Sequence, residues 1–192
     1  MARVRPVAVL DACVLYSIAV TDALISLGSR GLFRAKRTTR IESEWIRAIE
    51  NRRPDLVGRL STRRDAMQAA IVDWEVDDMA VEAISLDAEL PDPDDAHVLA
   101  AAIGAQADVI VSFNVTDFPE RVIDTYGLEV AHPDRFIVNL RESDTPLWID
   151  TFASMKQRLR KPVLSSHEFA EAFERAGLPN TADALRAVAD SL

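Results

Sequence analysis

The sequence predicts an α/β fold in which a central parallel β-sheet is covered by helices on both faces. Strand-like apolar runs alternate with helix-like segments up to about Ala131, and this alternation is typical of parallel sheets. Two of the runs, residues 6–10 and 109–113, are short and apolar throughout, as expected for strands that are covered on both faces.

The pattern changes after His132, where every segment is helix-like and opens on a Pro, Ser, Thr or Asp start signal. Three prolines, Pro146, Pro162 and Pro179, separate these segments. We therefore expect an α/β domain over residues 1–131, followed by a small helical C-terminal extension over residues 132–192.

The first half of the chain supplies one clear strand and several helices. The apolar run that ends at Leu10 predicts a strand, and the apolar periodicity that follows predicts a helix over residues 12–27. Further helices are expected from Thr38 or Thr39 to Arg52 and from Pro54 to about Ala70. Periodicity does not decide whether residues 72–76 or 84–86 form another strand.

The stretch from Pro91 to Pro119 organises the second half. It contains an acidic turn, an Ala-rich helix that ends near Gly104, a buried strand that Asp108 opens, and a second polar turn. A helix over residues 120–126 and a short strand over residues 128–131 are expected to complete the α/β domain.

The composition fits a folded protein without a membrane span. Of 192 residues, 48% are apolar and 28% are charged, so the chain can bury a core. It contains no apolar run near the ~20 residues that a span needs and no signal-peptide pattern. Cys13 is the only cysteine, which excludes an internal disulfide and a cysteine-based zinc cluster. A cytoplasmic protein is expected.

Charge is unevenly distributed along the chain. The net charge is −9, but residues 30–64 carry +7 and residues 65–95 carry −11. The first segment can offer a basic patch to phosphates and the second a carboxylate cluster to cations. Alternatively, the two segments form helix faces that pair with each other, and charge counting alone favours this second interpretation.

Four carboxylates, Asp11, Glu44, Asp95 and Asp117, each lie at the end or edge of an apolar element. If the strands are parallel, Asp11 and Asp117 share the carboxyl edge of the sheet, and helices packed over it can bring the other two there. Like charges gathered in this way require a counter-charge. Because all the donors are oxygens, Mg²⁺ or Mn²⁺ is the expected cation.

Each carboxylate also has a purely structural interpretation. Asp11 and Asp95 suit helix caps, Glu44 suits a solvated helix face, and Asp117 suits an Asx-turn. Asp92 or Asp94 could replace Asp95 as the ligand. His97 is expected to be a surface or packing residue, and Cys13 a small buried thiol.

The motifs around these carboxylates resemble those of a known family. The segments VAVLDACVLYS, IESEW, DPDDAHVLAAA and VIVSFNVTDFP are similar, in this order, to the acidic motifs of PIN-domain nucleases, and most of all to VapC-type toxins of toxin–antitoxin pairs. The resemblance covers roughly residues 7–132, and the helical tail looks like an extension found in one branch of these toxins.

This resemblance implies a three-layer α/β/α fold and a Mg²⁺- or Mn²⁺-dependent endoribonuclease. Its acidic positions correspond to Asp11, Glu44, Asp95 and Asp117, with Ser112 and Asn114 as supporting polar residues. Family members are usually homodimers, and a small antitoxin silences them by covering the acidic groove, where a basic side chain would disturb the metal.

Some features of the resemblance remain open. Cys13 stands where Asn or Ser is common in the family, and Glu42 could take the place of Glu44. From the basic segment, Arg37 and Arg40 are candidate RNA contacts. The alternatives are a catalytically silent PIN-like module that binds RNA or protein and, ranked last, a phosphohydrolase with Asp11 as nucleophile.

Overall fold

The computed structural model describes residues 5–86 and 90–192 and contains a parallel sheet of four short strands. The strands lie in the order β2-β1-β3-β4, so β1 and β3 occupy the centre. Ala8 of β1 is aligned with Ala35 of β2 on one side and with Val109 of β3 on the other. The strand bounds are β1 Val7–Leu10, β2 Arg34–Lys36, β3 Val109–Val111 and β4 Glu129–Ala131.

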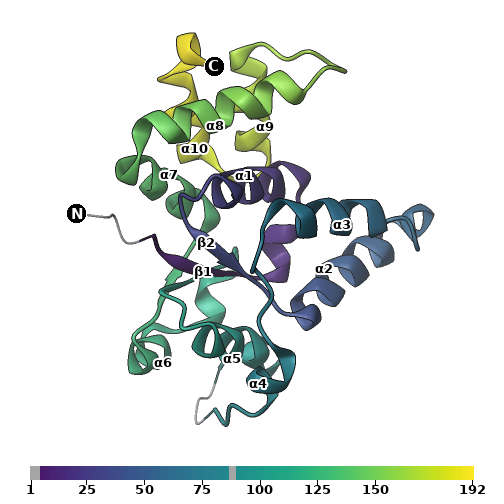
Figure 1. Cartoon of the computed structure of the whole chain (residues 1–192), viewed down its shortest axis with the longest axis vertical. Helices are drawn as coiled ribbons and strands as arrows, with labels where there is room; N and C mark the ends of the chain where they lie inside the picture. The colour runs from purple at the N-terminus through teal and green to yellow at the C-terminus, as the bar shows by residue number, and fades with distance from the viewer. Residues whose placement is uncertain (1–4, 87–89) are drawn as a thin grey trace.

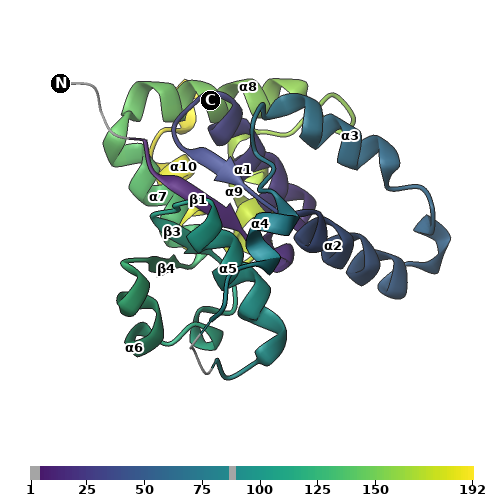
Figure 2. The same ribbon diagram turned by 60° about the horizontal axis from the view of Figure 1, so that its bottom comes forward.

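Helices cover both faces of this sheet. Figure 1 shows α1 and the C-terminal helices on one side of the sheet, and α4, α5 and α6 on the other. Helices α2 and α3 project to the side, as Figure 2 also shows. The helix bounds are α1 Ile18–Ser29, α2 Thr39–Arg52, α3 Ser61–Ala70, α4 Asp78–Glu82, α5 Ala96–Gly104, α6 Glu120–Ile123, α7 Pro133–Ser143, α8 Thr145–Arg158, α9 Ser166–Arg175 and α10 Pro179–Arg186.

The core is continuous between the α/β part and the C-terminal helices. Ala8, Val9 and Leu10 of the central strand are fully buried. Helices α8 and α9 pack against α1, and the Phe33 and Phe136 rings meet edge to face with centroids 5.0 Å apart. Burial of apolar surface therefore fixes the helical region onto the sheet layer. The α/β class, with a parallel sheet and a helical C-terminal region, is confirmed.

Strand β2 is the main element that sequence analysis missed. Arg34 and Lys36 interrupt its apolar character, and it has only three residues at the edge of the sheet. Lys36 is nevertheless buried, because its ammonium donates to the backbone carbonyl of Asp73 at 2.5 Å. A charged side chain with a local acceptor can thus belong to a buried strand.

Several predicted boundaries were wrong. The helix expected over residues 12–27 is divided into a 3₁₀ turn, Ala12–Leu15, and α1, with a break at Tyr16 and Ser17. The helix expected from Pro54 to Ala70 is a 3₁₀ turn followed later by α3. Neither 72–76 nor 84–86 forms a strand; Glu75 makes an isolated bridge to Arg37, and α4 was not foreseen.

Other predictions needed only small adjustments. The strand expected over residues 109–113 ends at Val111, and the helix expected over 120–126 becomes α6 plus a 3₁₀ turn. Within the described ranges, no helix is long and apolar enough to cross a membrane.

Candidate active site

The candidate site lies where the strand order reverses, beyond the carboxyl ends of β1 and β3. Chain connections run outward from β1 to β2 on one side, whereas β3 lies on the other, and ligands bind at such a switch point in open α/β sheets. Asp11 directly follows β1, and Ser112 directly follows β3. A cleft of about 1050 Å³ opens there, with Asp11, Glu44 and Asp95 in its wall.

Asp11 is 5% exposed and is held through one carboxylate oxygen. Its Oδ2 accepts hydrogen bonds from the Ser112 hydroxyl at 2.6 Å and from the Cys13 thiol at 3.0 Å. Its side chain does not cap the following 3₁₀ turn, so the capping interpretation does not account for it. Within the described ranges Oδ1 accepts no hydrogen bond, which leaves this oxygen free for a ligand.

Cys13 is part of the same arrangement and stays protonated. Burial, and then the nearby Asp11 charge, raise the pKa of the Cys13 thiol to about 12. The protonated sulfur donates to Asp11 and in turn accepts the Phe113 backbone N–H at 3.2 Å. The thiol, which was expected to be buried, is partly buried and also orients a carboxylate.

Asp95 carries an unfavourable negative charge. Partial burial raises the pKa of its carboxyl to about 6, and the charges of Asp11, Asp117 and Asp92 contribute further in the same direction. Its side chain makes no capping hydrogen bond to α5, although its backbone occupies the N-cap position. Three like charges therefore act on Asp95, and they outweigh the opposing effect of His97.

Glu44 reaches the cleft from α2 and is already paired. Its carboxylate contacts Arg40 Nε at 3.3 Å and His97 Nε2 at 2.9 Å. Burial raises the pKa of Glu44, but the hydrogen bonds and charges of His97 and Arg40 outweigh this effect, so the pKa lies below its ordinary value. Glu44 therefore lines the cleft with its charge paired by Arg40 and His97.

The remaining predicted residues are placed as follows. Asp117 ends the 3₁₀ turn Val115–Asp117 and acts on Asp95 through its charge, but it does not line the cleft. Asn114 lines the cleft and donates its backbone N–H to Ser112 Oγ at 3.0 Å. Asp92 caps the acidic turn by accepting the Asp94 N–H, and Asp94 lines the cleft.

The donor chemistry of this cluster fits a divalent cation, although a closed ligand set is absent. Among residues 5–86 and 90–192, no three acidic, His or Cys side chains converge closely enough to hold a metal ion. The free Oδ1 of Asp11 and the raised pKa of Asp95 both indicate a site that lacks positive charge. Carboxylate oxygens are the ligands that Mg²⁺ and Mn²⁺ prefer.

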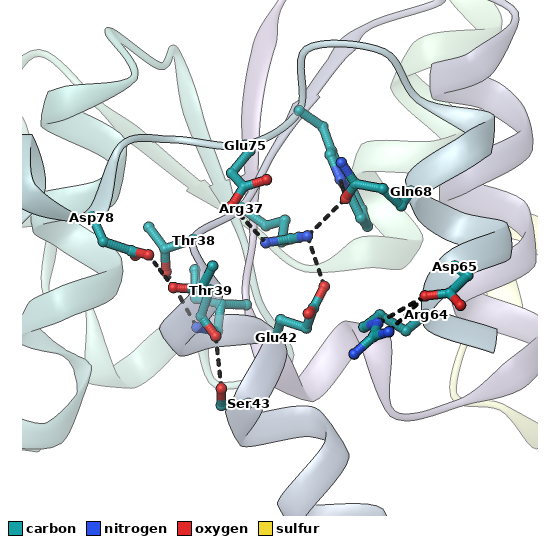
Figure 3. A network of polar contacts seen from close by, with 12 residues as sticks. Arg37, Thr38, Thr39, Glu42, Ser43, Arg64, Asp65, Gln68, Glu75 and Asp78 are labelled. Atoms are coloured by element: carbon teal, nitrogen blue, oxygen red, sulfur yellow. Dashed lines mark hydrogen bonds and ion pairs between the residues drawn. The ribbon is translucent and has the colours of Figure 1, made fainter. Parts of the chain in front are cut away.

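Arg37 does not face this cleft. Its side chain is almost fully buried, pairs with Glu42 at 2.7 Å and donates to Gln68 at 2.8 Å, while the guanidinium lies 4.9 Å from the centre of the Trp74 ring. Figure 3 shows the guanidinium enclosed between Glu42, Gln68 and Glu75. The expected RNA contact by Arg37 is therefore replaced by a structural role: it connects the end of β2 with α2 and α3.

The same network separates the two glutamates of α2. Glu42 points toward the buried Arg37, as Figure 3 shows, whereas Glu44 lines the cleft. Ile41, Trp45 and Ile49 form the buried face of this helix, which fixes the register. Of the two alternatives, Glu44 is the one that lines the cleft together with Asp11 and Asp95.

The cleft is also lined by residues for which the sequence predicts no site role, among them Tyr16, Arg47, Arg52 and His97. The His97 ring contacts the Asp94 carbonyl through Nδ1 at 2.7 Å and Glu44 through Nε2. A helical projection of α2 would have placed Arg47 two turns after Arg40, on the same face. No local signal marks Tyr16, which reaches the cleft because the predicted helix breaks there.

Comparison with known families agrees with the geometry. Residues 7–116 match the profile described as PIN domain, which is more than half of the chain. The chain belongs to the PIN-domain family. Residues 133–187 match the profile described as VapC50 C-terminal domain.

One curated protein matches a short part of the chain. A Mycobacterium tuberculosis (strain ATCC 25618 / H37Rv) protein named "Putative ribonuclease VapC50" is 42% identical over 45 residues, which are 23% of this chain and 27% of that protein. The match therefore spans about a quarter of the relative's length. No solved structure matches. This PIN-domain protein thus has a C-terminal region similar to that of VapC50, and PIN-domain proteins are typically metal-dependent.

Proposed function

We propose that this PIN-domain protein is a Mg²⁺- or Mn²⁺-dependent endoribonuclease, with Asp11, Asp95 and Asp117 as the central acidic residues and Glu44 at their border. The observation that carries the proposal is that Asp11, Glu44 and Asp95 line one cleft beyond the carboxyl ends of β1 and β3. Burial and neighbouring carboxylates there raise the pKa of Asp95 to about 6. A cluster that destabilises its own charges is costly for folding and is retained where a bound ligand compensates it.

Neighbouring side chains position the carboxylates of the cleft. Ser112 and Cys13 hold Asp11 by Oδ2, and Oδ1 accepts no hydrogen bond from the part of the chain that the structure describes. Arg40 and His97 hold Glu44 in its ionised form at the edge of the cleft. When bound, a divalent cation supplies positive charge for the phosphoryl transition state and a more acidic water.

We further propose that the enzyme is the toxin of a toxin–antitoxin pair, acts as a homodimer and is silenced by a small antitoxin that covers the cleft. The VapC-like C-terminal region and the relative's printed name support this assignment. We also propose the domain division at residues 131 and 132, with the helical region packed on α1 as a fixed part of the molecule.

A nuclease assay tests the enzymatic part. The purified full chain is incubated with a mixture of structured RNAs and Mg²⁺ or Mn²⁺, with and without a chelator. Cleavage is expected only with the metal, and Asp11→Asn and Asp95→Asn are each expected to lower its rate by about 10²–10³-fold. Asp65→Asn, which changes an exposed aspartate outside the cleft, is the matched control.

The outcome separates the two candidate functions. Cleavage that persists undiminished in Asp11→Asn and Asp95→Asn would remove the nuclease proposal. Retention of RNA without any cleavage by the wild-type chain would favour the silent binding module. Because both aspartates serve one site, the losses from the two substitutions should not add in the double variant.

A further inference from the structure

The basic segment 30–64 is largely neutralised within the protein, and this identifies the cations that remain for a partner. Among residues 5–86 and 90–192, ion pairs engage Arg30, Arg34, Lys36, Arg37, Arg40, Arg53 and Arg64. Arg63 donates to the backbone carbonyl of Leu15 at 2.7 Å. Over the same described ranges, Arg47, Arg52 and Arg59 make no ion pair.

Two of these three arginines lie in the cleft. Arg47 and Arg52 line it and are exposed, whereas Arg59 is exposed elsewhere. Arg40 lines the same cleft, with its side chain 57% exposed and only its Nε hydrogen-bonded to Glu44. We name Arg40, Arg47 and Arg52 the arginine strip; along α2 it is about 18 Å long at 1.5 Å per residue.

The strip begins at the acidic cluster. Arg40 contacts Glu44, so positive charge continues directly from the candidate catalytic end of the cleft. A polyanion whose one phosphate lies at the carboxylates must place neighbouring phosphates nearby, and a row of arginines stabilises such a backbone. Arginine also binds phosphate through paired donors.

The cleft also contains an aromatic side chain in its wall. Tyr16 lies at the break between the 3₁₀ turn Ala12–Leu15 and α1, is half-buried and lines the cleft. Arg63 donates to its backbone carbonyl, which fixes the break. A cationic groove with an aromatic platform is the arrangement by which proteins bind unpaired strands, because only an unpaired base can stack on the ring.

We propose that the arginine strip and Tyr16 form the substrate-binding path of this cleft and bind a single-stranded segment of RNA, with Arg47 and Arg52 on consecutive phosphates and Tyr16 under a base. This inference rests on the proposed function for the identity of the polyanion. It replaces Arg37 with Arg47 and Arg52 as the RNA contacts.

Binding in the absence of cleavage tests the path. Fluorescence anisotropy is measured with the full chain, a chelator and a labelled unstructured RNA of about 12 nucleotides, starting at about 50 mM salt. The Arg47→Gln/Arg52→Gln double variant is expected to bind at least about tenfold more weakly than wild type. Its slope of log K against log salt should be smaller by about 1.4, since each lost contact to a single strand accounts for about 0.7.

The controls distinguish the path from bulk charge and from a folding defect. Arg59→Gln removes one positive charge outside the cleft and should leave both affinity and slope unchanged, whereas Arg47→Gln and Arg52→Gln should each lower both. Tyr16→Ala should weaken binding about tenfold, while Tyr16→Phe, which retains the ring, should not. Thermal melting should be the same for the arginine variants and wild type, because these side chains are exposed.

Several results would overturn the proposal. These are failure of the wild-type chain to bind the single strand, an equal loss in Arg59→Gln, or better competition by the duplex of the same sequence. Unchanged RNA binding in the double variant, together with lost binding of a poly-glutamate probe, would assign the strip to an acidic protein segment instead. Because cleavage is not the readout, RNA binding with these dependences but without nuclease activity would reject the proposed function and retain this inference.

Discussion

Among the described residues, two aspartates are buried, Asp134 and Asp11, and their hydrogen bonding differs. In the helical region, Asp134 is 2% exposed and accepts hydrogen bonds on both oxygens, from the backbone and side chains of Asn180 and Thr181 at 2.7–2.9 Å. In the cleft, Asp11 is 5% exposed and accepts hydrogen bonds on one oxygen only. Asp95 has its pKa raised to about 6 by burial and by its acidic neighbours.

This difference separates a structural carboxylate from a binding one. Asp134 fixes the start of α10 against α7, and its charge is satisfied by donors within the protein. The aspartates of the cleft leave charge and lone pairs unsatisfied, a state that a bound cation can complete. The comparison predicts that substitution of Asp134 affects stability and that substitutions of Asp11 and Asp95 affect activity.

The largest expected effect is loss of cleavage in Asp11→Asn. Removing one negative ligand should lower the cleavage rate by about 10²–10³-fold, since metal-assisted charge stabilisation contributes several kcal/mol. The free energy of unfolding should change by less than about 1 kcal/mol, because Asn retains an acceptor for Ser112 and Cys13. The cleavage rate per folded molecule and urea unfolding measure the two effects. An Asp11→Asn variant with wild-type activity would contradict the binding role of Asp11.

Asp134→Asn should show the reverse behaviour. In Asn, an NH₂ group replaces one carboxylate oxygen, so one acceptor is lost and a donor faces the donors of Asn180 or Thr181. The free energy of unfolding should therefore fall by about 2–4 kcal/mol. Cleavage per folded molecule at low temperature should match wild type. The measurement is urea denaturation monitored by circular dichroism. A variant as stable as wild type that has lost cleavage would show that Asp134 is needed for activity and not for stability.

Asp95→Asn should stabilise the metal-free protein at neutral pH. The folded pKa of about 6 lies above the reference value of 3.8, so the folded state binds the proton more tightly than the unfolded state. This group's contribution to stability is therefore greatest below about pH 4 and is lost as pH rises through 6. With an allowance for solvent screening, the gain in Asp95→Asn is about 1 kcal/mol at pH 7–8.

Thermal melting at several pH values tests this prediction. The advantage of Asp95→Asn over wild type should shrink toward pH 4, where Asp95 is neutral in the folded protein. Excess Mg²⁺ should reduce or reverse the advantage at pH 7–8, since it stabilises wild type more than the variant. An Asp95→Asn variant less stable than wild type without metal would show that the carboxylate is structural.

The sequence predicted this division only in part. The α2 register could be read because Ile41, Trp45 and Ile49 recur at helical spacing, and it places Glu44 at the cleft edge. Strand β2 was missed because it has only three residues and two of them, Arg34 and Lys36, are charged. It is a strand because it pairs with β1 in the sheet.

Long-range contacts explain the remaining differences in the site. Arg37 has the sequence context of an exposed cation, but Glu42, Gln68 and Trp74 enclose it in the fold. Asp134 meets its donors 46 and 47 residues further along the chain. No local periodicity predicts such contacts, whereas Asp11 and Asp95 were identifiable because they immediately follow or begin an apolar element.

The smallest expected effect concerns Cys13, which supports Asp11 without binding ligand. Cys13→Ser keeps a donor to Asp11 and should change the cleavage rate by no more than about threefold, whereas Cys13→Ala removes the donor and should lower it by about tenfold. With its pKa at about 12, the native thiol is almost entirely protonated at pH 8. Since the thiolate is the nucleophile, alkylation of the folded protein should be on the order of a thousandfold slower than after unfolding in urea. Rapid alkylation of the folded protein would show that Cys13 is ionised and would remove it as a hydrogen-bond donor to Asp11.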